Sequence, residues 1–588
     1  MIRYFQNSST NLFYLVILHQ YILDKLSSDT EQTEKIKASD LLVKCLETEK
    51  VEYIFGIPGE ENADLMMSLL DSKIKFILTR HEQGAAFMAD VYGRLTEKVG
   101  VCLATLGPGA TNLATGVANA NMDRSRVLAI TGQSDSHLLH KESHQNMDVI
   151  TMFKPITKWS WSIRNAKNIP EIVRRAFKIA LSEKPGATHI ELPQDIAKRE
   201  SDIPPIIPQT IYRSTANKEL IKQATSIILQ AKRPLIFIGN GCVREDASKT
   251  IRRFAKETGI CSMNTFMAKG VIRDDQERHL RTLGIKEADH ALLAMKEADV
   301  VIAIGLDLVE YSPRNWNSNL DKTIIHIDFT PSEVYTFYRP EVEIVSDIED
   351  AVNSILEEME KQKNEKPESI ELPRKDIPEI FRKIKQEVEI RTESFKDDMT
   401  YPIQPEKLVI DVRESLDEND IVLSDVGAHK MWISKIYKTF EPNTCLIPNG
   451  FCSMGFALPG AIVSKMVYPE RNVVAMCGDA GFLMNVQELE TAVRLALPII
   501  IVVWCDRDLG LISLKQMEVF GKTGFTKFNN PDFVTLAKSF GAVGYHVKSV
   551  KEFEERLRDA KQEKYKPTII AVDIDYTRNR ILLDDNFI

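Results

Sequence analysis

The order of apolar and polar residues predicts alternating strands and helices from about residue 36 onward. Short apolar runs rich in Val and Ile recur along the chain, beginning with Val51–Phe55, Ile74–Leu78, Val99–Ala104 and Val127–Thr131. Runs of this length and composition are typical of strands buried on both faces of a parallel sheet. Amphipathic stretches such as Gly84–Arg94 lie between them and predict helices. The alternation indicates α/β domains, each a doubly wound parallel sheet covered by helices on both faces.

Two interruptions divide this pattern into three α/β blocks. A proline-rich stretch, Ile203–Pro208, is suited to an extended linker, and a charged stretch, Glu358–Lys375, marks a second boundary. Further apolar runs lie at Pro234–Gly241, Ala298–Gly305, Thr323–Asp328, Asp420–Asp425, Asn472–Cys477 and Pro498–Trp504. We therefore predict an N-terminal extension over residues 1–35, a first domain over 36–203, a central domain over 215–360, a linker over 361–400 and a third domain over 401–575.

Composition and charge narrow the class of protein. The chain has 588 residues, 44% of them hydrophobic, with 75 basic and 84 acidic residues and a net charge of −9. A mildly acidic chain without a basic tract offers no electrostatic surface for nucleic acid. The eight cysteines are scattered, mostly inside apolar runs, and form no Cys-x-x-Cys pair. We therefore expect buried thiols in a reducing compartment.

The start of the chain is unusually apolar. The run Leu12–Leu18 is far shorter than the roughly 20 residues that span a bilayer. No small-residue cleavage site follows it, so the sequence does not indicate a signal peptide. We expect a cytoplasmic protein without a membrane partner, whose N-terminal extension lies outside the fold.

Small residues and carboxylates follow two neighbouring strands of the third block. Gly478-Asp479-Ala480-Gly481 comes directly after one buried strand, a helix is expected over Asn485–Leu497, and Asp506 follows the next strand. The carboxyl ends of parallel strands are where α/β sheets bind ligands. Small residues let the backbone approach a phosphate, and carboxylates supply the hard oxygen ligands that Mg²⁺ prefers. The unit is suited to a metal diphosphate, although Asp479 alone could simply cap the following helix.

The spacing of this unit resembles the signature of thiamin-diphosphate enzymes, in which Gly-Asp-Gly is followed at a set distance by Asn. Asp506 lies 27 positions after Asp479, so the resemblance implies that both ligate Mg²⁺. It also implies a third ligand, the main-chain carbonyl of Asp508. The chain departs from the signature twice, with Ala480 in place of Gly and Asp506 in place of Asn. Asp keeps an oxygen ligand and adds charge, so we expect the metal site to survive.

A carboxylate also follows the second strand of the first block. Glu82 is followed closely by three small residues, Gly84, Ala85 and Ala86, which favour close packing over an exposed start of a helix. In the thiamin-diphosphate enzymes that this segment resembles, such a Glu hydrogen-bonds N1′ of the aminopyrimidine and promotes proton removal from C2. The resemblance implies that Glu82 is the catalytic residue. The turn Leu106–Asn112, which opens a helix expected over Ala110–Ala120, resembles the same first domain.

Two further loops of the third block resemble cofactor loops of the same family. These loops are Asp425-Val-Gly-Ala-His429, at the end of a predicted strand, and Asn449-Gly-Phe-Cys-Ser-Met-Gly455. The resemblance implies that Gly427, Ala428 and His429 contact the diphosphate. It also implies that Cys452 offers its carbonyl to the 4′-amine and that Met454 supports the bent cofactor. For Met454 the plain alternative, core packing, does not exclude this role.

The resemblance extends over residues 36–575 and is closest to acetolactate synthases of the catabolic, flavin-independent type. It is carried by Phe55–Gly59, Ser143–Asp148, Met152–Lys158, Gly305–Tyr311 and Trp316-Asn317. The arginine motif with which the biosynthetic enzymes contact FAD is missing, which implies that FAD is absent. The implied reaction condenses two pyruvates to 2-acetolactate and CO₂ through a cofactor-bound hydroxyethyl carbanion. The implied assembly is a homodimer or homotetramer with its sites between subunits.

Three polar residues are candidates for contacts with the substrate. Gln133 and Gln145 lie close to the matched loops, although ordinary hydrogen bonding within the fold explains them equally well. Lys515 stands where biosynthetic relatives that favour 2-oxobutyrate carry Trp, and a lysine stem offers no comparable flat apolar wall.

Other functions remain open at this point. A pyruvate oxidase or a 2-oxo acid decarboxylase would share every motif above. A bound flavin would distinguish the oxidase, and free aldehyde as the product would distinguish the decarboxylase. A non-catalytic relative is motivated by Ala480 and by the unusual start of the chain, but the presence of Glu82, Asp479 and Asp506 argues against it. A NAD-dependent dehydrogenase lacks support because no Gly-x-Gly-x-x-Gly follows a predicted strand.

Overall fold

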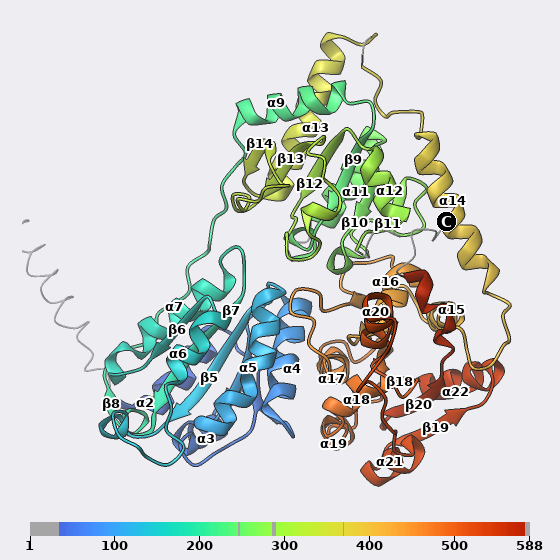
Figure 1. Cartoon of the computed structure of the whole chain (residues 1–588). Helices are drawn as coiled ribbons and strands as arrows, with labels where there is room; N and C mark the ends of the chain where they lie inside the picture. Colours follow the sequence, from blue (N-terminus) through green and yellow to red (C-terminus); the bar gives the residue numbers. More distant parts are fainter. Residues whose placement is uncertain (1–34, 245–246, 285–289, 369, 583–588) are drawn as a thin grey trace, which may run out of the picture.

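The computed structural model describes residues 35–244, 247–284, 290–368 and 370–582, and it divides them into three α/β domains. Each domain is built on a six-stranded sheet in which all neighbouring strands are parallel, as the sequence predicts. In Figure 1 the first and third domains lie side by side and the central domain lies above both. The predicted N-terminal extension falls, apart from Lys35, outside the described residues.

The first and third domains share one strand order, and the central domain has another. In the first domain the order is β3-β2-β4-β5-β7-β6, and in the third it is β16-β15-β17-β18-β20-β19, so the second-numbered strand lies at the edge in both. The central sheet follows β11-β10-β9-β12-β13-β14, the dinucleotide-fold order. In the third domain the order reverses between β15 and β17, which makes that edge a topological switch point.

The first domain spans 36–203. Its strands are β2 (Tyr53–Gly56), β3 (Lys75–Leu78), β4 (Gly100–Ala104), β5 (Val127–Gln133), β6 (Trp159–Ser162) and β7 (Ala187–Pro193). Its helices are α2 (Ala38–Thr48), α3 (Ala63–Leu70), α4 (Glu82–Thr96), α5 (Gly107–Met122), α6 (Val149–Phe153), α7 (Ile169–Leu181) and α8 (Gln194–Ala197). A small antiparallel pair, β1 (Ile36–Lys37) with β8 (Glu200–Ser201), ties the start of the domain to its end.

The central domain follows an extended, largely exposed stretch over residues 202–217. Its strands are β9 (Pro234–Ile238), β10 (Cys261–Asn264), β11 (His279–Thr282), β12 (Val300–Ile304), β13 (Thr323–Asp328) and β14 (Pro340–Val345). Its helices are α9 (Lys218–Gln230), α10 (Gly241–Arg244), α11 (Ser248–Thr258), α12 (His290–Glu297) and α13 (Ile348–Glu365). The stretch 361–400, expected to be a linker, instead holds the end of α13 and all of α14 (Glu379–Ser394). Phe381 and Ile384 of α14 are buried in the central core. The sequence pattern does not predict this contact, because charged residues surround the two side chains in the chain.

The third domain carries the remaining elements. Its strands are β15 (Ile421–Ser424), β16 (Cys445–Leu446), β17 (Val473–Gly478), β18 (Ile500–Cys505), β19 (Val543–Val547) and β20 (Thr568–Asp573). Its helices are α15 (Pro405–Ser415), α16 (Ala428–Ile436), α17 (Ala457–Val467), α18 (Asp479–Met484), α19 (Glu488–Arg494), α20 (Gly510–Phe520), α21 (Phe533–Phe540) and α22 (Val550–Gln562).

Several helix boundaries differ from the sequence prediction for identifiable reasons. Helix α4 begins two residues early, at Glu82, because the His81 side chain caps it by accepting from Gln83 N. Helix α5 begins at Gly107 rather than Ala110, with a proline in its first turn, as this residue prefers. The helix expected over Asn485–Leu497 is shorter: it is α19, which begins at Glu488, and a separate short helix, α18, ends just before it at Met484. The break at Asn485 frees its side-chain amide to donate to the carbonyl of Gly455 at 2.8 Å.

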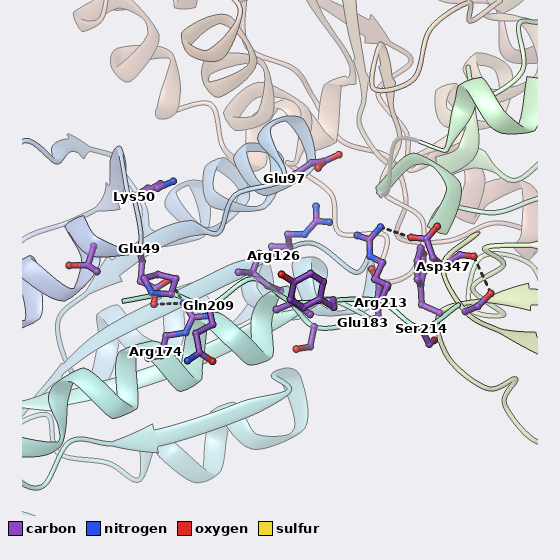
Figure 2. A pocket seen from close by; sticks show the side chains of 18 residues that line it. Glu49, Lys50, Glu97, Arg126, Arg174, Glu183, Gln209, Arg213, Ser214 and Asp347 are labelled. Carbon is purple, nitrogen blue, oxygen red and sulfur yellow. Dashed lines mark hydrogen bonds and ion pairs between the residues drawn. The ribbon is translucent and has the colours of Figure 1, made fainter. Parts of the chain in front are cut away.

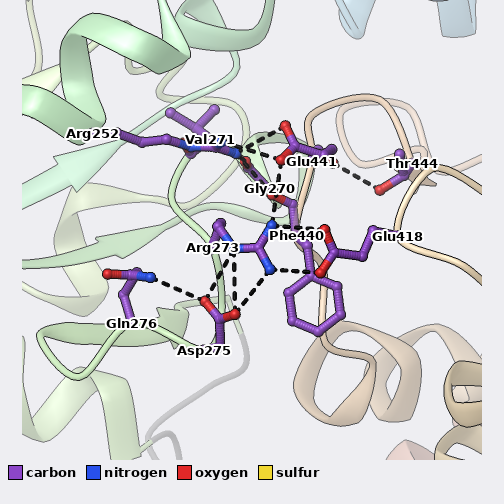
Figure 3. Close-up of polar contacts among 10 residues, drawn as sticks. All are labelled: Arg252, Gly270, Val271, Arg273, Asp275, Gln276, Glu418, Phe440, Glu441 and Thr444. Carbon is purple, nitrogen blue, oxygen red and sulfur yellow. Dashed lines mark hydrogen bonds and ion pairs between the residues drawn. The ribbon is translucent and has the colours of Figure 1, made fainter.

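The three domains are joined by two kinds of contact. Helix α4 of the first domain packs on α17 of the third, where the rings of Phe87 and Phe456 meet edge to face at 5.7 Å in one shared apolar core. The central domain contacts the third through charges, as Figure 3 shows: Arg273 bridges to Glu418 at 2.7 Å, and Arg252 donates to the carbonyl of Phe440 at 2.8 Å. Across residues 35–244, 247–284, 290–368 and 370–582, no helix has both the length and the apolar character needed to cross a membrane.

Candidate active site

A pocket of about 110 Å³ opens at the switch point of the third sheet. Its wall is formed by the loops after β15, β17 and β18, by Met454, by the first turn of α20, and by Tyr576. All of the residues that line it belong to the third domain. The structure therefore brings together most of the third-domain residues on which the sequence analysis relied, but Cys452 and Lys515 do not line this pocket.

Asp479 and Asp506 face each other across the carboxyl ends of β17 and β18. Asp479 is fully buried, and its Oδ2 accepts from the main-chain N–H groups of Asp506 and Arg507, at 3.2 and 2.8 Å. Burial, together with the neighbouring Asp479 carboxylate, raises the pKa of Asp506 to about 7. Two carboxylates held this close repel each other, and a cation between them would offset that cost.

Asp508 cannot offer its carboxylate freely. Its side chain accepts from Ser513 Oγ at 2.7 Å and pairs with Lys527 Nζ at 2.8 Å. These contacts engage both oxygens of the Asp508 carboxylate and favour its main-chain carbonyl as the candidate metal ligand.

Asp425 ties the cofactor loops together and was not among the residues singled out from the sequence. It is fully buried, and its carboxylate accepts from the N–H groups of Val426, Gly455 and Ala457 at 2.7, 2.9 and 3.0 Å. A Cβ on Gly481 would lie 2.8 Å from Asp425 Oδ1. Asp425 thus joins the loops after β15 and β17 to the Met454 loop. Its position at a strand end, two residues before Gly427, was the signal available in the sequence.

His429 lines the same pocket with an unsatisfied nitrogen. Its ring is buried, and its Nε2 has no hydrogen-bond partner among the described residues. Burial lowers the pKa of His429 to about 3, so the imidazole is neutral at physiological pH. A buried polar atom without a partner costs free energy, and a polar ligand in the pocket would satisfy it.

Met454 and Tyr576 complete the wall, and Asn530 contacts Asp479 from outside it. Met454 reaches the pocket from a loop in which Cys452 adopts a positive φ of 56° and its Sγ lies 3.1 Å from Lys430 Nζ. Tyr576 stacks on Trp504, with ring centroids 6.2 Å apart. The amide of Asn530 donates to Asp479 Oδ2 at 2.7 Å. Tyr576 and Asn530 lie far beyond the motif in the chain, so spacing arguments could not find them.

Glu82 lies apart from this pocket. It is the first residue of α4, is nearly buried, and its Oε2 accepts from Asn112 Nδ2 of α5 at 2.9 Å. Gly109 leaves room for the carboxylate, since a Cβ there would lie 3.3 Å from Glu82 Oε1. Asn112 is a second residue that sequence reasoning left without a role, although it lies in the quoted turn.

The three candidate substrate residues lie in different surroundings. Both ends of the Gln133 amide are engaged within the first domain, where Nε2 donates to Glu191 at 2.9 Å and Oε1 accepts from Ser134 N at 2.9 Å. Gln145 is exposed, and its main chain packs on the Gly107 turn. Lys515 is exposed on α20, three residues after Ile512, which lines the pocket, and so lies on the same helix face.

A larger pocket lies elsewhere and lacks the motif residues. It has a volume of about 580 Å³ and lies between the first domain, the stretch after residue 202 and the central domain (Figure 2). Two ion pairs join charged groups of its wall, Arg174 with Glu49 and Arg213 with Asp347. The smaller pocket at the switch point is therefore the better candidate for the chemistry.

Comparison with known proteins identifies the family. Three family models match: the N-terminal, central and C-terminal domains of thiamine pyrophosphate enzymes, over residues 36–152, 221–355 and 425–572. The chain is 34% identical to the acetolactate synthase of Bacillus subtilis (strain 168), over 96% of this chain and 97% of that protein. The chain belongs to the thiamin-diphosphate-dependent acetolactate synthase family.

Further relatives cover nearly the same length. A probable acetolactate synthase large subunit of Methanocaldococcus jannaschii is 35% identical, over 89% of this chain and 90% of its own. A catabolic acetolactate synthase of Raoultella terrigena is 31% identical, over 93% of this chain and 96% of its own. The family resemblance noted in the sequence is confirmed, and the chain is a thiamin-diphosphate-dependent enzyme.

The pocket of this family member fits the diphosphate end of thiamin diphosphate. Gly478, Ala480 and Gly481 keep its floor free of bulky side chains, and His429 presents the unsatisfied nitrogen described above. Buried Asp479 and half-buried Asp506 both line this pocket, and their carboxylates fit a divalent cation bound to the same diphosphate.

We expect adjacent substitutions in this loop to have opposite effects. Gly481→Ala should lower thiamin diphosphate affinity about tenfold or more, because its Cβ displaces Asp425, and one hydrogen bond to a charged group is worth about 1.5–3 kcal/mol. Ala480→Gly, the matched control, removes a methyl without touching Asp425 and should leave the affinity unchanged or higher. Calorimetric titration at saturating Mg²⁺ measures both. Wild-type affinity in Gly481→Ala would show that Asp425 does not hold the diphosphate-binding loops in place.

Proposed function

We propose that this chain is an acetolactate synthase, which condenses two pyruvates to 2-acetolactate and CO₂ with thiamin diphosphate and Mg²⁺. The observation that carries the proposal is the carboxylate pair of buried Asp479 and half-buried Asp506 beside the small residues Gly478, Ala480 and Gly481, in a chain aligned over nearly its whole length with acetolactate synthases. Seven of the eight cysteines are buried and all are free, which supports a reducing, cytoplasmic location.

Each part of the pocket has a distinct role in this proposal. Asp479, Asp506 and the carbonyl of Asp508 hold Mg²⁺, and Gly427, Ala428 and His429 contact the diphosphate. Met454 and the carbonyl of Cys452 position the pyrimidine end. When bound, thiamin diphosphate supplies a nucleophilic carbon and takes up the electrons that decarboxylation releases. Glu82 holds the proton at N1′ of the pyrimidine, and the amide of Asn112 keeps its carboxylate oriented.

The assembly in this proposal is a homodimer or homotetramer with sites between subunits. Glu82 does not line the pocket of its own chain, because α4 packs on α17 instead. Beside the pocket, the second half of α20 and the loop after it expose Met517, Val519, Phe520 and Phe525. Clustered exposed apolar side chains at the mouth of a pocket mark an interaction surface. A second copy would cover them and bring its own Glu82.

The proposal includes the absence of FAD. At the carboxyl ends of β12 and β13, where a dinucleotide-type sheet binds its ligand, Lys184 of the first domain pairs with Asp307 at 2.9 Å. Arg244 pairs with the same carboxylate at 2.6 Å. The cavity where the three domains meet measures only about 30 Å³, the volume of about one water molecule. The two ion pairs at the carboxyl ends of β12 and β13 support the proposed absence of FAD.

The product formed from pyruvate tests the proposal. Purified protein with pyruvate, thiamin diphosphate and Mg²⁺ should give 2-acetolactate as the main product by NMR, from a colourless enzyme. With equal pyruvate and 2-oxobutyrate, acetolactate should still dominate, because Lys515 offers no apolar wall and one methylene is worth only about 1–3 kcal/mol. A yellow, flavin-containing protein would favour a pyruvate oxidase, and free acetaldehyde a decarboxylase. A strong excess of acetohydroxybutyrate would contradict the proposed acceptor.

Subunit complementation tests the shared site. Glu82→Gln and Asp479→Ala each remove one half of it, so each variant alone should be inactive. A mixed dimer has one site with both substitutions and one site with neither, so random mixing should restore about a quarter of wild-type activity. Co-expression with two different affinity tags isolates the mixed species. If the doubly tagged protein is inactive, Glu82 and Asp479 act within one chain.

A further inference from the structure

The turn that carries Glu82 is held from outside its own domain. Between β3 and α4, the main-chain N–H groups of Arg80 and His81 both donate to Glu488 Oε1, at 3.0 and 2.9 Å. Glu488 is the first residue of α19 in the third domain and is fully buried. Its Oε2 accepts from Thr491 Oγ1 at 2.7 Å, which fixes the orientation of the carboxylate.

Helix α19 holds the same turn at its other end as well. Arg494, the last residue of α19, donates to the carbonyl of Leu78, the last residue of β3. On the α4 side the fit is tight, since a Cβ on Gly84 would lie 2.7 Å from Glu488 Oε1. The strand end, the turn and the first turn of α4 are therefore all placed by one helix of another domain.

The N-terminus of α4 depends on these contacts for its hydrogen bonding. The first amides of a helix have no partner within it, and buried amides must find one elsewhere. His81 Nδ1 accepts from Gln83 N at 3.0 Å, and Glu488 accepts from the main-chain N–H groups of Arg80 and His81, directly before α4. A carboxylate at this end of a helix is also favoured by the helix dipole. Without Glu488, the peptide groups directly before Glu82 lose their fixed orientation.

We propose that Glu488 is a positioning residue for Glu82: it fixes the turn before α4 from the third domain and so aims the catalytic carboxylate. The inference rests on the proposed role of Glu82. Geometry, not charge, is what the turn requires, because an amide oxygen can accept the same two hydrogen bonds. Burial raises the pKa of Glu488 to about 7, so part of the population is already neutral at physiological pH.

Amide hydrogen exchange in the cofactor-free protein tests the contact itself. The amides of Arg80 and His81 should be protected in the wild type and in Glu488→Gln, and exposed in Glu488→Ala. Gly84→Ala places a Cβ against Glu488 Oε1 and should disrupt the same contact from the α4 side. Because alanine is favoured in helices, the protein should stay folded while the same two amides become exposed. Protection that survives in both alanine variants would overturn the proposal, whatever reaction the enzyme catalyses.

The rate of hydrogen–deuterium exchange at C2 of added thiamin diphosphate tests the consequence for Glu82. Glu488→Ala and Gly84→Ala should slow it about 10- to 100-fold, since a misplacement of about 1 Å costs about 100-fold, with cofactor affinity unchanged. Glu488→Gln should keep the wild-type rate. Combining the two alanine substitutions should add little to either one, because both break the same contact.

A matched control separates positioning from general loss of structure. Asp420 is also a buried third-domain carboxylate that accepts from two main-chain amides, those of Asn472 and Asp417, but it precedes β15 at the far end of the sheet. Asp420→Ala should lower the melting temperature and leave the C2 rate unchanged. Equal C2 rates in Glu488→Ala and Asp420→Ala would overturn the proposal. Absence of acetolactate from the wild type would instead refute only the proposed reaction.

Discussion

The packing of α4 on α17 is the constraint on which the rest of the structure depends. It merges the cores of the first and third domains, with Phe87 against Phe456, so neither sheet can move independently of the other. Closely packed protein interiors transmit a displacement rather than absorb it. Within this arrangement Glu82 contacts Asn112 of α5 and does not line the pocket of its own chain. This is why the proposed site includes a second copy of the chain.

Within the third domain, buried carboxylates carry the organisation of the pocket. Burial raises the pKa of both Asp425 and Asp506, but three main-chain amides oppose that rise at Asp425, whereas the neighbouring Asp479 carboxylate adds to it at Asp506. The two situations differ in hydrogen bonding, because amides stabilise a carboxylate and a second carboxylate destabilises it. Asp425 therefore holds the loops of the pocket in place. The pair Asp479 and Asp506 is where a bound cation would relieve the most electrostatic repulsion.

The sequence alone predicted the three parallel sheets, the family and the third-domain loops that meet in one pocket. These follow from local signals: buried apolar runs, and small residues at the ends of β15 and β17. It did not predict α14, because charged residues surround its two buried apolar side chains in the sequence. It also did not predict the break at Asn485, whose side-chain amide donates to the distant carbonyl of Gly455. It also missed Asn112, Asn530 and Glu488, because their partners lie 30 to 408 positions away in the chain. Such contacts exist only once the domains have packed.

The central claim is that the Glu82 carboxylate activates a cofactor held by the third domain. The most direct test compares the rate of hydrogen–deuterium exchange at C2 of thiamin diphosphate in the wild type and in Glu82→Gln, at saturating cofactor and Mg²⁺. The account predicts nearly equal cofactor affinity and exchange slowed by about 100-fold or more in the variant, since a positioned proton-transfer group contributes about 10²–10⁴-fold. Exchange at the wild-type rate in Glu82→Gln would contradict it.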